Sequence, residues 1–285
     1  MRLADGRLAA LSWGDARAPT WLALHGWLDN AASFVRLAPL LVERLGIRIV
    51  ALDFAGHGHS RHLTGEGHYA LWDYCHDVLD ALDALGLERT PLLAHSMGAG
   101  VACLLAASLP ERVESLTLID GLGAVTTDPS ASSRQLRKGL MARRRSRSTA
   151  PRYADIESAV AARVAGSATP IDAVTVAPLV ERNLEALAWG EWRLRSDSRL
   201  RWASPVRLTP DQVLAVLGAI RCSVLLIEGE QGILAEREGM ARGRAAVPEL
   251  TRRVLPGGHH LHLEPERVDA VAAVIAAHVQ GADRS

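Results

Sequence analysis

The stretch LLAHSMGAG, residues 92–100, is the most informative segment of the sequence. It begins as a short apolar run typical of a buried parallel strand, and the apolar stretch 97–109 that follows is typical of a buried helix. Ser96 lies at the junction. A strand that passes straight into a helix through such a serine makes a strained turn, which holds the hydroxyl up at the end of a sheet. The plainer interpretation is a serine that only caps a helix.

The residues around Ser96 favour the strained turn. Neighbouring backbone passes close to such a turn, so the flanking side chains must be small, and Gly98 and Gly100 satisfy this requirement. Ala94 replaces the glycine that is more usual before the serine, which is a mild departure. The backbone N–H of Met97 comes at the start of the helix, where it can stabilise an oxyanion.

Strand and helix patterns alternate on both sides of this stretch. The short apolar runs are 20–26, 47–53, 90–96, 113–120, 223–229 and 250–256, and helical patterns cover 70–86, 97–109, 235–247 and 265–280. This alternation predicts an α/β fold with a mostly parallel sheet flanked by helices. From about 124 to 212 we find helical stretches but no strand run. We therefore predict a core domain formed by 1–123 and 213–285, with an all-helical lid, or cap, inserted at 124–212.

Composition places the chain among globular proteins. Its 285 residues are 48% hydrophobic and 22% charged, and 32 basic residues balance 32 acidic ones. Zero net charge argues against a general polyanion binder, and every apolar run is too short to span a membrane. Cys75, Cys103 and Cys222 are far apart, as expected for free thiols. We expect a cytoplasmic monomer or homodimer without a nucleic-acid or membrane partner.

A nucleophilic serine needs a base, and the base needs a partner that orients it. In this type of fold the partners follow the serine in the order acid, then histidine. The stretch 256–268 places a glycine-flanked histidine, His259, between the last strand and the last helix. His259 is the best candidate for the base, and His260 and His262 compete with it. We expect one of the three to line the site while the others pack or face water.

Six stretches of the chain resemble the α/β-hydrolase superfamily, and within it the serine hydrolase-like proteins, over nearly the whole length. They are HGWLDNAASF (25–34), LDFAGHGHS (52–60), AHSMGAG (94–100), ERVESLTLIDGLG (111–123), VLLIEGEQG (224–232) and GGHHLHLEPERV (257–268). In such relatives the residue after His-Gly supplies the second oxyanion N–H, and this position is Trp27. The resemblance also implies that His259, rather than His260 or His262, is the catalytic base.

The acid departs from the pattern of many relatives. They place it just beyond the strand 224–229 as Gly-x-x-Asp, whereas this chain has Gly232 at that place. Another branch, which includes the haloalkane dehalogenases, takes its acid from the end of the preceding strand, where this chain has Asp120. We assign the role to Asp120, with Glu230 as the rival. The alternative for Asp120 is an ordinary Asp-Gly turn without a catalytic role.

A histidine cluster raises the alternative of a zinc-dependent hydrolase. His57, His59 and His62 have the spacing of a dinuclear zinc motif, but Arg61 lies where that motif needs a carboxylate. The same residues also fit the turn after a central strand of an α/β hydrolase, so we predict no metal here. A second alternative is a non-catalytic binding protein that has kept the fold.

Two features of the predicted lid leave alternatives open. The Arg-rich segment 134–152 is most simply a solvated helix, although some of its arginines would attract an acidic substrate if they faced the cleft. A nucleic-acid site there is weakly supported, because no aromatic residues alternate with the charges. Trp189, Trp192 and Trp202 either line an apolar pocket or form the lid's own core.

The function that the resemblance implies is hydrolysis of a small-molecule carboxylic ester, or of a related thioester or lactone, without a cofactor. Ser96 attacks the carbonyl, His259 takes its proton and Asp120 orients the imidazole ring. The backbone N–H groups of Trp27 and Met97 then hold the oxyanion, and water releases an acyl-enzyme.

Overall fold

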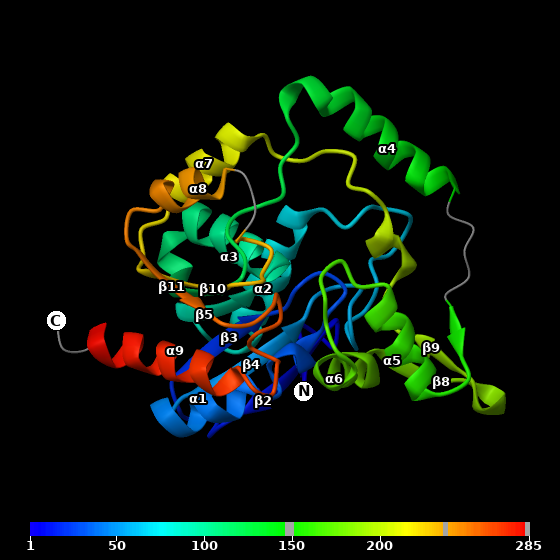
Figure 1. Ribbon diagram of the computed structural model, residues 1–285, viewed down its shortest axis with the longest axis horizontal. Helices are drawn as coiled ribbons and strands as arrows, with labels where there is room; N and C mark the ends of the chain where they lie inside the picture. Colours follow the sequence, from blue (N-terminus) through cyan, green and yellow to red (C-terminus); the bar gives the residue numbers. More distant parts are fainter. Residues whose placement is uncertain (146–150, 236–238, 283–285) are drawn as a thin grey trace.

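A computed structural model describes residues 1–145, 151–235 and 239–282 (Figure 1). Its centre is an eight-stranded sheet with the strand order β1-β2-β4-β3-β5-β6-β10-β11. Strand β2 pairs antiparallel with β1 and β4, and the remaining neighbours are parallel. The strands are β1 (Arg2–Leu3), β2 (Leu8–Trp13), β3 (Thr20–Leu24), β4 (Arg48–Asp53), β5 (Thr90–His95), β6 (Val113–Ile119), β10 (Val224–Gly229) and β11 (Leu250–Leu255).

Helices cover both faces of this sheet (Figure 1). One face packs on α1 (Leu37–Leu45) and α9 (Val268–Ala282), and the other on α2 (Tyr74–Ala84), α3 (Met97–Ser108), α7 (Pro210–Gly218) and α8 (Met240–Ala246). Successive side chains of a strand point to opposite faces. In β3, Leu22 and Leu24 therefore join the α2–α3 side of the core, while Trp21 and Ala23 join the α1–α9 side. Burial on both faces explains why the strands appear as continuous apolar runs.

The predicted α/β fold is confirmed, and the predicted runs correspond to β3, β4, β5, β6, β10 and β11. Strands β1 and β2 were not predicted. The helix predicted at 235–247 begins at Met240 in the described part of the chain, and residues 236–238 lie outside it. All three cysteines are free thiols, and burial raises the pKa of Cys103 to about 12.

The segment 124–212 is not all helical, which corrects our prediction. Its helices are α4 (Ser132–Arg145), α5 (Ile156–Ala165) and α6 (Ala173–Asn183), and its strands are β7 (Arg152–Tyr153), β8 (Leu184–Ala186) and β9 (Trp192–Leu194). The strands form a separate sheet with the order β7-β9-β8. Strands of two or three residues are too short to show an alternating pattern. The domain boundaries at 124 and 212 stay a prediction. Residues 146–150 of the Arg-rich segment lie outside the described residues.

Short 3₁₀ helices complete the structure: η1 (Ala31–Phe34), η2 (Leu71–Asp73), η3 (Pro110–Arg112), η4 (Pro129–Ala131), η5 (Ala188–Gly190) and η6 (Ser198–Arg201). Among the described residues, no helix combines the length and the apolar character needed to cross a membrane.

The parallel strands end together at one edge of the sheet. Ser96 directly follows β5 and Asp120 directly follows β6, so the topology brings two of the predicted site residues to adjacent positions.

Candidate active site

Ser96, His259 and Asp120 form a continuous chain of hydrogen bonds. The Nε2 atom of His259 lies 2.9 Å from Ser96 Oγ, and its Nδ1 atom lies 2.6 Å from Asp120 Oδ2. A carboxylate only accepts hydrogen bonds, so Nδ1 carries the proton of the neutral ring and Nε2 accepts from the serine hydroxyl. Asp120 is completely buried and His259 nearly so. This is the arrangement in which a histidine can deprotonate a serine and be stabilised when it becomes charged.

The turn at Ser96 has the strain that the sequence predicts. Its backbone angles are φ 51° and ψ −112°, an unfavourable region for a residue with a side chain. The Ser96 N–H donates to the Ile119 carbonyl at 3.1 Å, which ties the turn to β6. A Cβ atom at Gly98 would lie 2.3 Å from the Leu24 carbonyl oxygen, so the helix can approach β3 this closely only with glycine there.

Asp120 is held by the backbone of the neighbouring strand. Its own N–H donates to the Ile227 carbonyl at 2.8 Å, and the Ile233 N–H donates to its Oδ2 at 2.7 Å. A Cβ atom at Gly232 would lie only 2.2 Å from Asp120 Oδ1. The carboxylate of Asp120 therefore fills the space next to the position where many relatives place their acid. The rival Glu230 is exposed, with its N–H paired to the Leu255 carbonyl.

Trp27 and Met97 line the same cavity as Ser96 and His259. Met97 is the first residue of α3, and the first N–H groups of a helix have no partner within it. Such groups attract developing negative charge. The Trp27 indole N–H donates to the Leu200 carbonyl at 2.8 Å, which connects the loop after β3 to the segment 124–212. Their roles as oxyanion donors stay a prediction.

The cavity has a volume of about 690 Å³ and is bounded by both the sheet edge and the segment 124–212. Of the three predicted pocket tryptophans, Trp202 lines it. Trp189 and Trp192 are not among its lining residues, so the pocket alternative is wrong for both. Trp192 packs against the small cluster around α5 and α6, which fits the alternative of a core within the lid. Trp189 is 99% exposed in η5, so neither alternative holds for it. Trp72 also lines the cavity but was not predicted, because its sequence position in η2 gives no sign of the direction it faces.

The structure does not support the zinc alternative at His57, His59 and His62. Within the described residues, the ligand atoms of these three histidines do not form a converging group. Each ring has a nitrogen within hydrogen-bond distance of a backbone carbonyl: His57 at Ala55, His59 at Arg182 and His62 at Arg195. Burial lowers the pKa of His57 to about 3, so this ring is neutral near pH 7.

The histidines that competed with His259 have structural partners instead. His260 Nε2 lies 3.1 Å from Asp29 Oδ2, and His262 Nε2 lies 2.8 Å from Ser33 Oγ. Sequence reasoning missed Asp29. The signal that could have found it is its place in the stretch 25–34, four residues after the histidine that begins it.

Comparisons with known proteins show which family the chain belongs to. Residues 19–266 match the model of the alpha/beta hydrolase fold family. The chain is an α/β hydrolase. Two of its relatives are serine hydrolase-like proteins, one from Dictyostelium discoideum (33% identical over 90% of this chain and 74% of the relative) and one from Danio rerio (30%, over 93% and 84%).

Among solved structures, this α/β hydrolase is similar to a hypothetical protein from Pseudomonas aeruginosa PAO1. The two are 46% identical with a TM-score of 0.89, and the match covers 96% of this chain and 95% of the other. The similarity therefore extends over the segment 124–212 as well as the sheet. The family membership predicted from six separate motifs is confirmed.

Gly232→Ala should disrupt the site without disrupting the fold. The new methyl group would overlap the Asp120 carboxylate and push it away from His259, and displacements of about 1 Å can cost roughly 100-fold in rate. We expect kcat for an ester to fall at least about 100-fold. Gly218→Ala is the matched control, because the nearest atom would lie at an ordinary 3.6 Å. Unchanged kcat in a folded Gly232→Ala protein would contradict this account of the acid.

Proposed function

We propose that the chain is a serine hydrolase that cleaves carboxylic esters, or related thioesters or lactones, through an acyl-enzyme. The observation that carries this proposal is the unbroken hydrogen-bond chain from Ser96 through His259 to Asp120. Ser96 and His259 line a large cavity, so a substrate carbonyl has access to the hydroxyl. A non-catalytic binding protein would have no need of this alignment.

The proposed reaction uses each of these contacts. Ser96 Oγ attacks the carbonyl carbon while His259 Nε2 takes the hydroxyl proton, and Asp120 stabilises the imidazolium that forms. The negative oxygen of the tetrahedral intermediate lies against the backbone N–H groups of Met97 and Trp27. His259 then gives its proton to the leaving alcohol. In the second half it takes a proton from water, the hydroxide attacks the acyl group, and Ser96 regains its proton as the acid leaves.

The charges around the cavity favour a substrate with an acidic group. Its charged lining residues, apart from histidines, are Asp29, Lys138, Arg163, Arg199, Arg201 and Arg207. Arg163 pairs with Asp29 at 3.0 Å, and Arg199 pairs with Asp197 at 2.6 Å. Lys138, Arg201 and Arg207 form no ion pair with any described residue.

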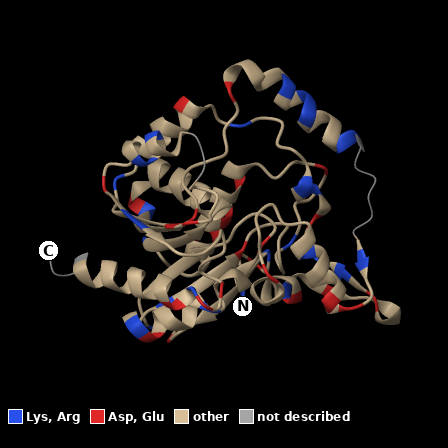
Figure 2. Cartoon of the chain, in the orientation of Figure 1, with Lys and Arg blue, Asp and Glu red and all other residues tan. Residues whose placement is uncertain are grey.

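Three unpaired cations around one cavity create a local positive field although the whole chain is neutral. Lys138 lies on α4, where further basic residues are spread along the helix (Figure 2). A concave site concentrates such a field and raises the local concentration of anionic ligands. The preferred substrate is therefore an ester that carries a second, negatively charged group.

The assignment of the acid predicts different results for two carboxylates. Asp120→Asn should lower kcat several hundred-fold or more, because the amide would hold the wrong histidine tautomer. Glu230→Gln should stay within about twofold of the parent, because Glu230 is exposed and the two ring nitrogens of His259 pair with Asp120 and Ser96 instead. Both are measured with a chromogenic ester, and Ser96→Ala gives the background rate. Equal losses in the two variants, or none in Asp120→Asn, would exclude this triad.

The charge preference predicts a selective loss. In a triple variant, Lys138→Gln with Arg201→Gln and Arg207→Gln, kcat/KM for p-nitrophenyl hemisuccinate should fall at least about tenfold. The value for the neutral p-nitrophenyl butyrate should change by less than about twofold. A second triple variant, Arg17→Gln with Arg221→Gln and Arg253→Gln, removes three exposed positive charges outside the cavity lining and is the control for net charge. A parallel loss for both esters would count against an acidic substrate while leaving the triad proposal intact.

A further inference from the structure

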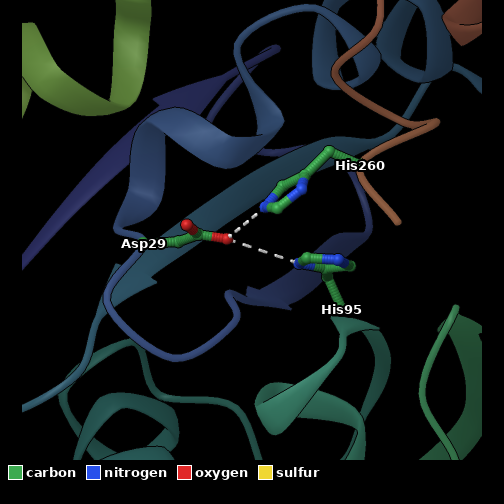
Figure 3. A group of neighbouring side chains, drawn as sticks. All are labelled: Asp29, His95 and His260. Carbon is green, nitrogen blue, oxygen red and sulfur yellow. Dashed lines mark hydrogen bonds and ion pairs between the residues drawn. The ribbon is translucent and has the colours of Figure 1, made fainter. Parts of the chain in front are cut away.

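Three buried side chains converge on one point (Figure 3). They come from the loop after β3, the end of β5 and the segment after β11. Asp29, His95 and His260 each offer one ligand atom, and these atoms lie within 4.8 Å of one another. Asp29 Oδ2 is 3.1 Å from His260 Nε2 and 3.6 Å from His95 Nδ1. Two ligands of a tetrahedral zinc ion, with bonds of about 2.1 Å, lie roughly 3.4 Å apart. The observed separations from Asp29 therefore suit a shared metal ion.

The ring of His95 presents an unpaired lone pair to this group. Its Nε2 atom lies 2.9 Å from the carbonyl oxygen of His259, so this nitrogen carries the proton and donates it. In the neutral ring Nδ1 is then an acceptor. It is fully buried, has no hydrogen-bond partner among the described residues, and faces the carboxylate of Asp29. Two facing acceptors repel each other, and a cation between them would replace this repulsion with attraction.

Two of the three residues, His95 and Asp29, have a second partner of the kind that orients metal ligands in proteins. A histidine ligand usually donates its second ring N–H to a carbonyl or carboxylate, as His95 does to His259. Arg163 holds the other oxygen of Asp29, Oδ1, at 3.0 Å and so fixes the direction of the carboxylate. Two imidazole nitrogens and one carboxylate oxygen suit Zn²⁺ and neighbouring transition metals better than Mg²⁺ or Ca²⁺.

Glycine at position 26 leaves room beside the three ligand atoms. A Cβ atom at Gly26 would lie 2.9 Å from His95 Nδ1 and 3.0 Å from Asp29 Oδ2. Gly26, Asp29 and His260 also line the large cavity. An ion can therefore arrive through the same opening as the substrate and take a water molecule from the cavity as a further ligand.

We propose that Asp29, His95 and His260 bind a divalent transition metal, with Zn²⁺ as the reference ion, and that the bound metal inhibits hydrolysis. The inhibitory part rests on the proposed function. His95 directly precedes Ser96 and His260 directly follows His259, and their ring centroids lie 4.5 Å and 5.0 Å from that of His259. A dication held there opposes the positive charge that develops on His259 during the reaction.

Binding is tested on the full chain, first stripped with a chelator. Isothermal titration with Zn²⁺ should give one site per chain, and Co²⁺ at the same site should show the intense visible absorption of a four- or five-coordinate ion. Asp29→Asn should weaken binding at least about 100-fold, since it removes the only anionic ligand. His62→Gln is the matched control at a half-exposed histidine, and it should bind as the parent does. If Asp29→Asn fails to fold, His260→Gln replaces it with the same expectation.

Two further variants separate this site from metal bound directly to the catalytic residues. Ser96→Ala and His259→Ala should retain Zn²⁺ affinity within about threefold, and this result is readable even if the chain hydrolyses no ester. In the active parent, Zn²⁺ should inhibit with a midpoint equal to its Kd, and chelator should restore the rate. Loss of binding in His259→Ala or His62→Gln, or full binding in both Asp29→Asn and His260→Gln, would overturn the proposal.

Discussion

The site centres on one contact, in which a buried carboxylate holds an imidazole ring against a serine hydroxyl. Asp120 can reach His259 because its own backbone is fixed to β10 and because position 232 has no side chain. Ser96 can reach the other side of the ring because a strained turn ties it to the end of β6. The parallel sheet is thus the frame that keeps three separate segments in register.

Local constraints explain why much of this site could be predicted from the sequence. The strained turn at Ser96 needs small residues close by, and this requirement appears as a short motif between a strand and a helix. Asp120 ends a recognisable strand, and Gly232 shows where the usual acid is missing. The structure explains that absence physically, because a carboxylate at 120 and a side chain at 232 would compete for one space.

Features set by tertiary packing could not be predicted in this way. Nothing in the sequence around Trp189 and Trp202 distinguishes their environments. In the structure Trp189 is exposed in η5, whereas Trp202 lines the cavity. Strand β7 pairs with β9 across about 40 residues of sequence, as in the pair Arg152 and Arg193, and β8 pairs with β9 as a short hairpin. Each of the three strands is too short to show a pattern of its own. The segment that contains them still bears on the site, because Arg163 holds Asp29 and the Leu200 carbonyl accepts from Trp27.

Covalent labelling with a fluorophosphonate measures whether His259 activates Ser96, because only an activated serine reacts quickly with this reagent. Mass spectrometry of the intact chain and of its peptides should show one adduct, located on Ser96. Labelling should be absent in Ser96→Ala and at least about 100-fold slower in His259→Ala. An unlabelled chain, or rapid labelling of Ser96 that does not depend on His259, would contradict the activation of Ser96 by His259.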